Sequence, residues 1–215
     1  MSQTLTALSA ALPLAAGWSI HSLRLRGRIE AARRDPLTDL VTRDAFTERA
    51  TRALADGRGA VYLIDLDGFK QINDTHGHAA GDAVLRATAQ RLKTWAPIND
   101  GIVTRFGGDE FAAATRVRSR AELVWQLDEL HRALTQPVQY EESSLSVGAS
   151  IGAAHCETSG ADLSALVRRA DEAMYTAKQN GGGRFLTEGL APLLQTVNGR
   201  RAGRRGTASG TGAAA

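Results

Sequence analysis

Residues 105–111 read Arg-Phe-Gly-Gly-Asp-Glu-Phe, and no other stretch constrains the fold as strongly. Two adjacent glycines let the backbone turn sharply, and the flanking residues 102–104 and 111–113 have the apolar or β-branched character of short strands. The stretch therefore predicts a β-hairpin with the carboxylates of Asp109 and Glu110 at its tip. Because two carboxylates at a tight turn repel each other, we expect a fold that keeps them there to hold a cation.

A second pair of acidic side chains follows an apolar run. Residues 60–66 are rich in Val, Leu and Ile and predict a central strand that is buried on both faces. Asp65 and Asp67 share one face of this strand if it continues through both. A carboxylate in such a place either caps a loop or holds a cation. An adjoining hairpin with further acids favours a site for Mg²⁺ and phosphate, because Mg²⁺ prefers oxygen ligands.

Asn73 and Asp82 flank a stretch that is expected to be a loop entering the next helix. A carboxylate can accept both donors on one edge of guanine, and an amide can donate to its O6 and N7 acceptors. The simpler interpretation is that Asn73 shapes a turn and Asp82 caps a helix. His76 and His78 lie between them, and structural hydrogen bonding is favoured over a metal site because no third soft ligand is near in the sequence.

The remaining pattern predicts alternating helices and strands. Apolar residues recur at helical spacing within residues 46–54, 84–95, 123–134 and 163–177. Residues 145–154 and 184–186 are expected to be strands. This order indicates an α/β fold in which helices pack on a sheet.

Charge is distributed unevenly along the chain. The net charge is +3, but residues 24–34 hold five arginines and one glutamate, and residues 200–205 hold four arginines. The rest of the chain is therefore acidic, which argues against nucleic-acid binding, since a nucleic-acid-binding core carries its basic patch on the folded surface. The single cysteine, Cys156, lies in an apolar run and is expected to be a buried, reduced thiol rather than a nucleophile.

The two ends differ from the body. Residues 1–23 contain no Asp, Glu, Lys or Arg, and about 20 such residues can cross a bilayer. We expect residues 1–23 to anchor the protein to the inner face of the cell membrane, with an Arg-rich linker helix over 24–34 on the cytoplasmic side. A surface or dimerising helix is the alternative, because Pro13 interrupts the stretch. Residues 191–215 lose periodicity and are expected to be a disordered basic tail.

Several of these segments together resemble one known family. The similar segments are 35–38 (Asp-Pro-Leu-Thr), 65–74, 77–82, 107–111, 150–152 and 170–178, in this order. They resemble the GGDEF-domain family, the diguanylate cyclases, and the catalytic domain is expected over residues 35–190. The resemblance implies a fold related to nucleotidyl cyclase catalytic domains and polymerase palm domains, with a central, mainly antiparallel sheet flanked by helices. It also implies that two GTP condense into cyclic di-GMP with release of two pyrophosphates.

The resemblance assigns a metal site and catalytic residues. Asp65, Asp109 and the carbonyl of Leu66 would hold Mg²⁺ or Mn²⁺, with Glu110 close by. Asp109 and Glu110 would serve catalysis, with Asp109 helping to remove the proton of the 3′-hydroxyl. A free aspartate is a weak base, so the metal is expected to contribute most of the activation.

The resemblance also assigns the residues that bind GTP. Asn73 and Asp82 would read the guanine base. The backbone amides around Gly68, Phe69 and Lys70 would wrap the terminal phosphates. The side chain of Lys178 would neutralise their charge. Each protomer would bind one GTP, so a homodimer would be needed for turnover.

Two departures from the family pattern bear on function. Many members carry an Arg-x-x-Asp inhibitory site just before the hairpin, but here that window reads Ile98-Asn99-Asp100-Gly101, so we expect no inhibitory site. Gly182 stands where a basic residue is common, which predicts weaker GTP binding unless Arg184 supplies the contact. The alternative function is a weak or inactive GTP-binding module that acts in signalling. A cyclic di-GMP receptor and a purely structural domain are less well supported by these residues.

Overall fold

The computed structural model describes residues 33–186. The membrane anchor expected over residues 1–23, most of the linker over 24–34 and the tail over 191–215 lie outside the described residues. Between residues 33 and 186, no helix is both long and apolar enough to cross a membrane.

The described chain contains both helices and strands, as the sequence predicts, but they do not strictly alternate, because α3 and α4 follow each other directly and so do β4, β5 and β6. The helices are α2 (Arg43–Ala53), α3 (Phe69–His76), α4 (His78–Ile98), α5 (Arg120–Leu134) and α6 (Leu163–Gln179). The strands are β1 (Gly59–Asp67), β2 (Ile102–Gly107), β3 (Glu110–Arg116), β4 (Val138–Tyr140), β5 (Ser143–Leu145), β6 (Gly148–Cys156) and β7 (Gly183–Leu186).

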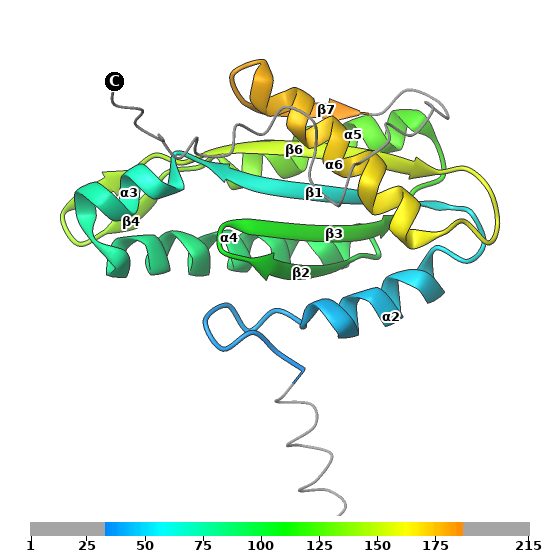
Figure 1. Cartoon of the computed structure of the whole chain (residues 1–215), viewed down its shortest axis with the longest axis horizontal. Helices are drawn as coiled ribbons and strands as arrows, with labels where there is room; N and C mark the ends of the chain where they lie inside the picture. The colour runs from blue at the N-terminus through cyan, green and yellow to red at the C-terminus, as the bar shows by residue number, and fades with distance from the viewer. Residues whose placement is uncertain (1–32, 187–215) are drawn as a thin grey trace, which may run out of the picture.

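Five strands form the central sheet, in the order β2-β3-β1-β6-β7. All neighbouring strands are antiparallel except β6 and β7, which are parallel. Helices cover both faces, with α6 in front of the sheet and α4 and α5 behind it (Figure 1). The predicted α/β fold with a mainly antiparallel sheet is confirmed.

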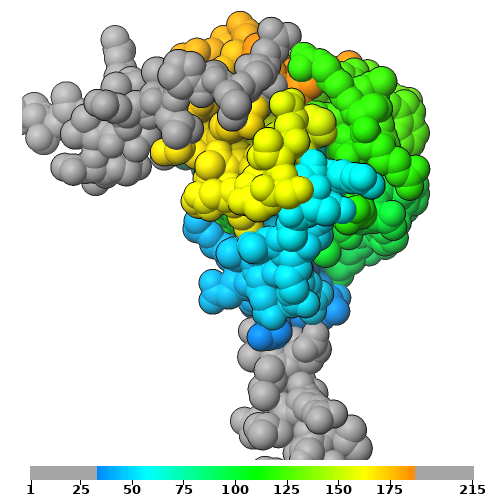
Figure 2. Space-filling model, turned by 90° about the vertical axis from the view of Figure 1, so that its right-hand side faces the viewer, coloured from blue at the N-terminus to red at the C-terminus, as the bar shows by residue number. Residues whose placement is uncertain are grey.

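The alternation of side chains along β1 explains the two layers of core. Tyr62, Ile64 and Leu66 pack into the core beneath α4 and α5, whereas Val61 and Leu63 pack into the core beneath α2 and α6. Because successive residues of a strand point to opposite faces, Asp65 and Asp67 point to the face that carries α6. The space-filling view shows the yellow surface of α6 directly above the blue surface of α2 (Figure 2).

Two local predictions need correction. The strand expected over residues 145–154 begins at Gly148, and Leu145 instead ends β5 of a separate two-stranded hairpin with β4. The stretch between Asn73 and Asp82 is not a loop, because Asn73 lies on helix α3 and only Gly77 separates α3 from α4. Residue 77 adopts a positive φ of 82°, which a glycine accommodates readily.

Candidate active site

A row of polar side chains crosses the sheet on the face that carries α6. In the register of the sheet, Asp65 on β1 lies opposite Glu110 on β3 and opposite Ser150 on β6. Strand β1 continues through Asp67, so Asp65 and Asp67 share this face as predicted. Asp65 is only 7% exposed, and a buried carboxylate requires a partner.

The partner of Asp65 is Lys178, which lies in the last turn of α6. The two side chains form an ion pair with 2.6 Å between Nζ and Oδ2. Burial raises the pKa of Asp65, the ion pair with Lys178 lowers it, and negative charge on Asp109 and Asp67 raises it again, so the net shift is upward. Surroundings that disfavour the ionised form of a carboxylate, and so raise its pKa, are typical of functional positions.

Asp109 is brought next to β1 by the backbone of the hairpin. The amide nitrogen of Leu66 donates to the carbonyl oxygen of Asp109 at 3.3 Å, and Glu110 begins β3 directly after the turn. The predicted hairpin with Asp109 and Glu110 at its tip is confirmed. The two predicted acidic segments therefore meet at one edge of the site.

The oxygen donors of this edge fit the chemistry of Mg²⁺, which takes carboxylate and carbonyl ligands. Among residues 33–186, however, no three His, Cys, Asp or Glu side chains lie together in a ready metal-binding group. His76 and His78 are exposed and are not part of such a group. A cation at Asp65 and Asp109 would therefore need phosphate oxygens to complete its coordination.

Gly182 leaves space beside Asp67 that a side chain would fill. Its φ is +93°, and a Cβ atom there would come within 2.8 Å of Asp67 Oδ2. Asp67 Oδ1 accepts a hydrogen bond of 2.7 Å from the hydroxyl of Ser150. No basic side chain can arise from position 182 in this backbone without strain.

Arg184 does not occupy that space. It lies opposite Ile151 in the parallel pair of β6 and β7, and Ile151 packs into the core beneath α4 and α5. Its guanidinium pairs with Asp128 on α5. Arg184 therefore points to the face of the sheet opposite to Asp65, which is the wrong face for a phosphate contact beside Asp67.

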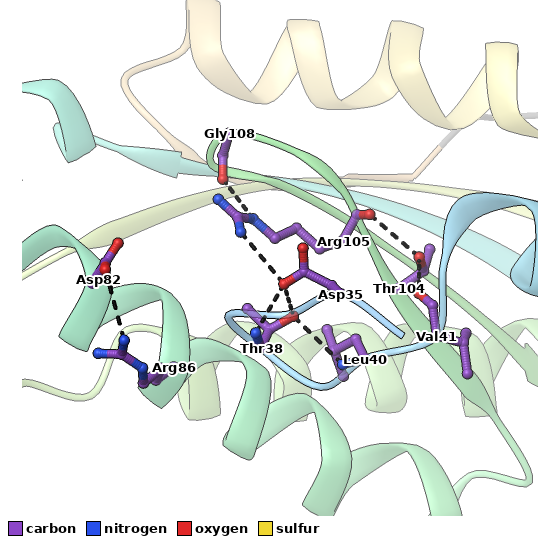
Figure 3. A network of polar contacts seen from close by, with 9 residues as sticks. All are labelled: Asp35, Thr38, Leu40, Val41, Asp82, Arg86, Thr104, Arg105 and Gly108. Atoms are coloured by element: carbon purple, nitrogen blue, oxygen red, sulfur yellow. Dashed lines mark hydrogen bonds and ion pairs between the residues drawn. The ribbon is translucent and has the colours of Figure 1, made fainter. Parts of the chain in front are cut away.

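The two predicted guanine-reading residues are brought together by the junction of α3 and α4. A Cβ atom on Gly81 would lie only 2.0 Å from Asn73 Oδ1, so the Asn73 amide rests directly on the backbone next to Asp82. The carboxylate of Asp82 is partly exposed and lies 3.7 Å from Arg86, one helical turn further on (Figure 3). The pair thus presents one amide and one carboxylate at the surface.

The connection between β1 and α3 can receive phosphate. Gly68 adopts the left-handed conformation with φ of 74°, and α3 begins at Phe69 and continues through Lys70. The first amides of a helix have no partners within the helix and attract anions. A cleft of about 510 Å³ opens here, between the start of α3 and β5, and Asp67, Gly68 and Ser144 contribute to its lining.

An unpredicted contact network holds the hairpin in place. The side chain of Arg105 donates from Nε to the carbonyl of Gly108 at 2.9 Å and pairs through Nη1 with Asp35 Oδ1 at 3.4 Å (Figure 3). Thr38 donates to the same Asp35 oxygen from its amide and its hydroxyl, at 2.8 and 2.6 Å. We call these four residues the Arg105 bridge.

The Arg105 bridge also shifts the pKa of Asp35. Burial raises the pKa of Asp35, but the hydrogen bonds from Thr38 and the charge of Arg105 outweigh it, so the pKa lies below its ordinary value. The sequence offered one signal for this network, an arginine two residues before the paired glycines. Its partner lies 70 residues away, and no spacing rule connects the two.

The chain belongs to the GGDEF-domain family. The family described as "Diguanylate cyclase, GGDEF domain" matches residues 32–184. The chain is 46% identical over 171 residues to an uncharacterized 19.3 kDa protein of Streptomyces ambofaciens, covering 78% of this chain and 89% of that protein. It is 37% identical to the diguanylate cyclase TpbB of Pseudomonas aeruginosa, covering 73% of this chain but only 38% of TpbB.

Solved structures agree with this assignment. The GGDEF domain of TpbB superposes with a TM-score of 0.65 and 38% identity, covering 72% of this chain and 94% of that one. The coiled coil and GGDEF domain of DgcB from Caulobacter crescentus, solved in complex with c-di-GMP, gives a TM-score of 0.71 at 26% identity, covering 84% of this chain and 99% of that one.

Proposed function

We propose that this protein is a diguanylate cyclase that condenses two GTP into cyclic di-GMP. The observation that carries the proposal is the meeting of three features at the end of β1. These three features lie next to the end of β1 and the residues that follow it. They are the Asp65–Lys178 ion pair, the Asp109–Glu110 turn and the Asn73–Asp82 pair. One GTP fits this order, with guanine at the junction of α3 and α4 and phosphates at Gly68 and Lys178.

The reaction joins two such sites. The 3′-oxygen of one GTP attacks the α-phosphorus of the other, a phosphorus–oxygen bond forms, and pyrophosphate leaves. The same step in the opposite sense closes the ring and releases the second pyrophosphate. Asp109 would accept the proton of the attacking hydroxyl, and Lys178 would neutralise charge on the phosphates. Positioning and electrostatic stabilisation supply most of the rate in such phosphoryl-type transfers.

Mg²⁺ or Mn²⁺ would be held by the carboxylates of Asp65 and Asp109 and by the carbonyl of Leu66. When bound, the ion lowers the pKa of the 3′-hydroxyl and offsets negative charge on the α-phosphate. Asp65 already has a cationic partner in Lys178, so we expect the site to take the ion together with nucleotide phosphates.

A homodimer is part of the proposal, because one copy holds only one GTP. The half-site borders open space: a cleft of about 790 Å³ lies between α2 and α6, with Glu110 at its edge. A second copy facing this edge would bring its own 3′-hydroxyl to the α-phosphorus. We also propose that residues 1–23 attach the protein to a membrane, which fractionation of cells expressing the full chain would test.

The test is direct. Full-length protein, with a dimerising coiled coil fused to its N-terminus, is incubated with GTP and Mg²⁺, and cyclic di-GMP is measured by mass spectrometry. We expect product from the wild type and none above background from Asp109→Ala, with an unchanged circular dichroism spectrum. A variant with near-normal activity would refute the role of Asp109.

The alternative is a GTP-binding module without turnover, and Gly182 is the observation that favours it. GTP bound by the wild-type fusion with no cyclic di-GMP formed would support this second function. Loss of both GTP binding and product would refute both.

A further inference from the structure

A third cleft lies on the far side of the sheet from the candidate active site. It is about 250 Å³ in volume and lies between α4 and α5, the two helices behind the sheet (Figure 1). Trp95 and Ile98 of α4 and Glu129 of α5 contribute to its lining. None of these residues takes part in the proposed reaction.

Two buried polar atoms at this cleft have no hydrogen-bond partner in the described structure. They are Trp95 Nε1, a donor, and Glu129 Oε2, an acceptor. Trp95 is only 3% exposed, and its ring is held edge-on against Tyr62 at 5.4 Å between centroids. A buried polar group without a partner costs about 1–3 kcal/mol, so a fold that retains two at one cleft points to a ligand that pairs with them.

The one cation among the residues that line the cleft is already engaged. Arg91 donates from Nη1 to the Leu134 carbonyl at 3.0 Å and from Nη2 to the Pro137 carbonyl at 2.9 Å. No ion pair to Glu129 is found within residues 33–186. The carboxylate of Glu129 is therefore left for a cation from outside the described chain.

The exposed residues that line the cleft are both polar and apolar. They are Gln90, Thr94 and Ile98, and Ile98, at the end of α4, is 67% exposed. Trp125 on α5 lies outside this lining and is 51% exposed. Trp125 precedes Glu129 by four residues, so the two lie on the same side of α5. Exposed large apolar side chains that lie together mark protein-binding surfaces, and the carboxylate of Glu129 adds a preference for a partner that presents a cation.

We propose that this cleft binds a segment of a partner protein that presents a lysine or arginine beside an aliphatic side chain. The cation would pair with Glu129, a backbone carbonyl would accept from Trp95 Nε1, and the aliphatic group would cover Ile98 and Trp125. A peptide offers all three groups within a few ångströms, whereas an anionic nucleotide would be repelled by Glu129. The proposal does not depend on cyclase activity.

The experiment uses full-length protein labelled with ¹⁵N at tryptophan and a short amidated peptide that repeats Leu-Ala-Ala-Lys. We expect the indole N–H signals of Trp95 and Trp125, assigned from single Trp→Phe variants, to shift in a saturable way. Glu129→Gln should weaken binding about tenfold or more, because a charge-assisted hydrogen bond contributes about 1.5–3 kcal/mol. Glu142→Gln, an exposed acid on the β4–β5 turn, is the matched control and should bind as the wild type.

Three results would overturn the proposal. One is the absence of any shift at Trp95, which would mean that its indole and Glu129 find partners within the chain. Another is equal binding of a control peptide that repeats Leu-Ala-Ala-Glu, or equal binding by Glu129→Gln. The third is self-association of the wild type, measured by sedimentation without peptide, that Ile98→Ser abolishes. That result would assign the cleft to a second copy of this chain.

Discussion

Replacing Gly81 by alanine should weaken guanine recognition without unfolding the protein. Gly81 lies in α4, and an added Cβ would sit 2.0 Å from Oδ1 and 2.9 Å from Cγ of Asn73. Atoms in ordinary contact need more than 3 Å, so the amide of Asn73 must move by roughly 1 Å or more, away from the place where it would meet the base. We expect the backbone of α4 to stay in place, because alanine is well accommodated in a helix.

The magnitudes have opposite signs for binding and for stability. Loss of one or two hydrogen bonds from Asn73 to guanine, each worth about 0.5–1.5 kcal/mol, should weaken GTP binding roughly 2- to 150-fold. A glycine inside a helix is less stable than alanine by roughly 0.5–1 kcal/mol. The free energy of unfolding should therefore stay unchanged or rise slightly.

Calorimetric titration with GTP and urea unfolding would measure the two effects on Gly81→Ala, on Asn73→Ala and on the double variant. Because the alanine acts through Asn73, the double variant should bind GTP no more weakly than Asn73→Ala alone. Additive losses in the double variant, or wild-type affinity in Gly81→Ala, would refute the placement of Asn73 in the guanine site.

Three further predictions concern the rest of the site. Arg105→Gln should lower the free energy of unfolding by about 1–3 kcal/mol, because it removes the charged donor from the Gly108 carbonyl and the Asp35 carboxylate. It should also lower kcat more than it raises KM, and a loss of GTP affinity alone would contradict this. The folded-state pKa of Asp35 lies below its ordinary value. The ionised Asp35 therefore adds to the free energy of unfolding above about pH 4, and this stabilisation is lost as the pH falls through the folded-state pKa. The difference in unfolding free energy between wild type and Arg105→Gln should therefore shrink in acid, and a constant difference would count against the ion pair. Gly182→Ala should destabilise the fold by roughly 1–2 kcal/mol, since φ is +93°, and an unchanged melting temperature would show that the backbone relaxes. Asp65→Asn should lose activity but melt no lower than the wild type at pH 7. The pKa of Asp65 is raised in the folded state, so the ionisation of Asp65 lowers the stability of the wild type as the pH rises through its titration. A clearly lower melting temperature of the variant would mean that the ion pair with Lys178 outweighs the cost of burial.

The sequence predicted those elements in which apolar periodicity is strong and long. Strand β1 and helix α5 fall close to their expected limits, because each places a regular apolar pattern against the core. Helix α3 was not expected, since its eight residues bury only Ile72 and one buried side chain establishes no period. The β4 and β5 strands, of three residues each, are too short for the same reason.

The candidate site was predicted in its residue types but not in all of its contacts. Asp65, Asp109 and Asn73 could be proposed because their motifs are local in the chain. The ion pair of Asp65 with Lys178 and the link from Arg105 to Asp35 join residues 113 and 70 positions apart. Such contacts follow from the order of strands in the sheet, which local pattern does not determine.

The turn that precedes α2 is bonded to two parts of the site at once. Asp35 is tied to the hairpin through Arg105, Val41 pairs with Thr104 on β2, and Asp39 pairs with Lys93 on α4 at 2.9 Å. The carboxylate tip and the helix that carries Asp82 therefore share one point of attachment where the described chain begins. A torque applied at this turn would act on the tip and on α4 together. In the proposed homodimer, we expect such an input to change how one copy approaches the other more than it changes the distances inside one copy.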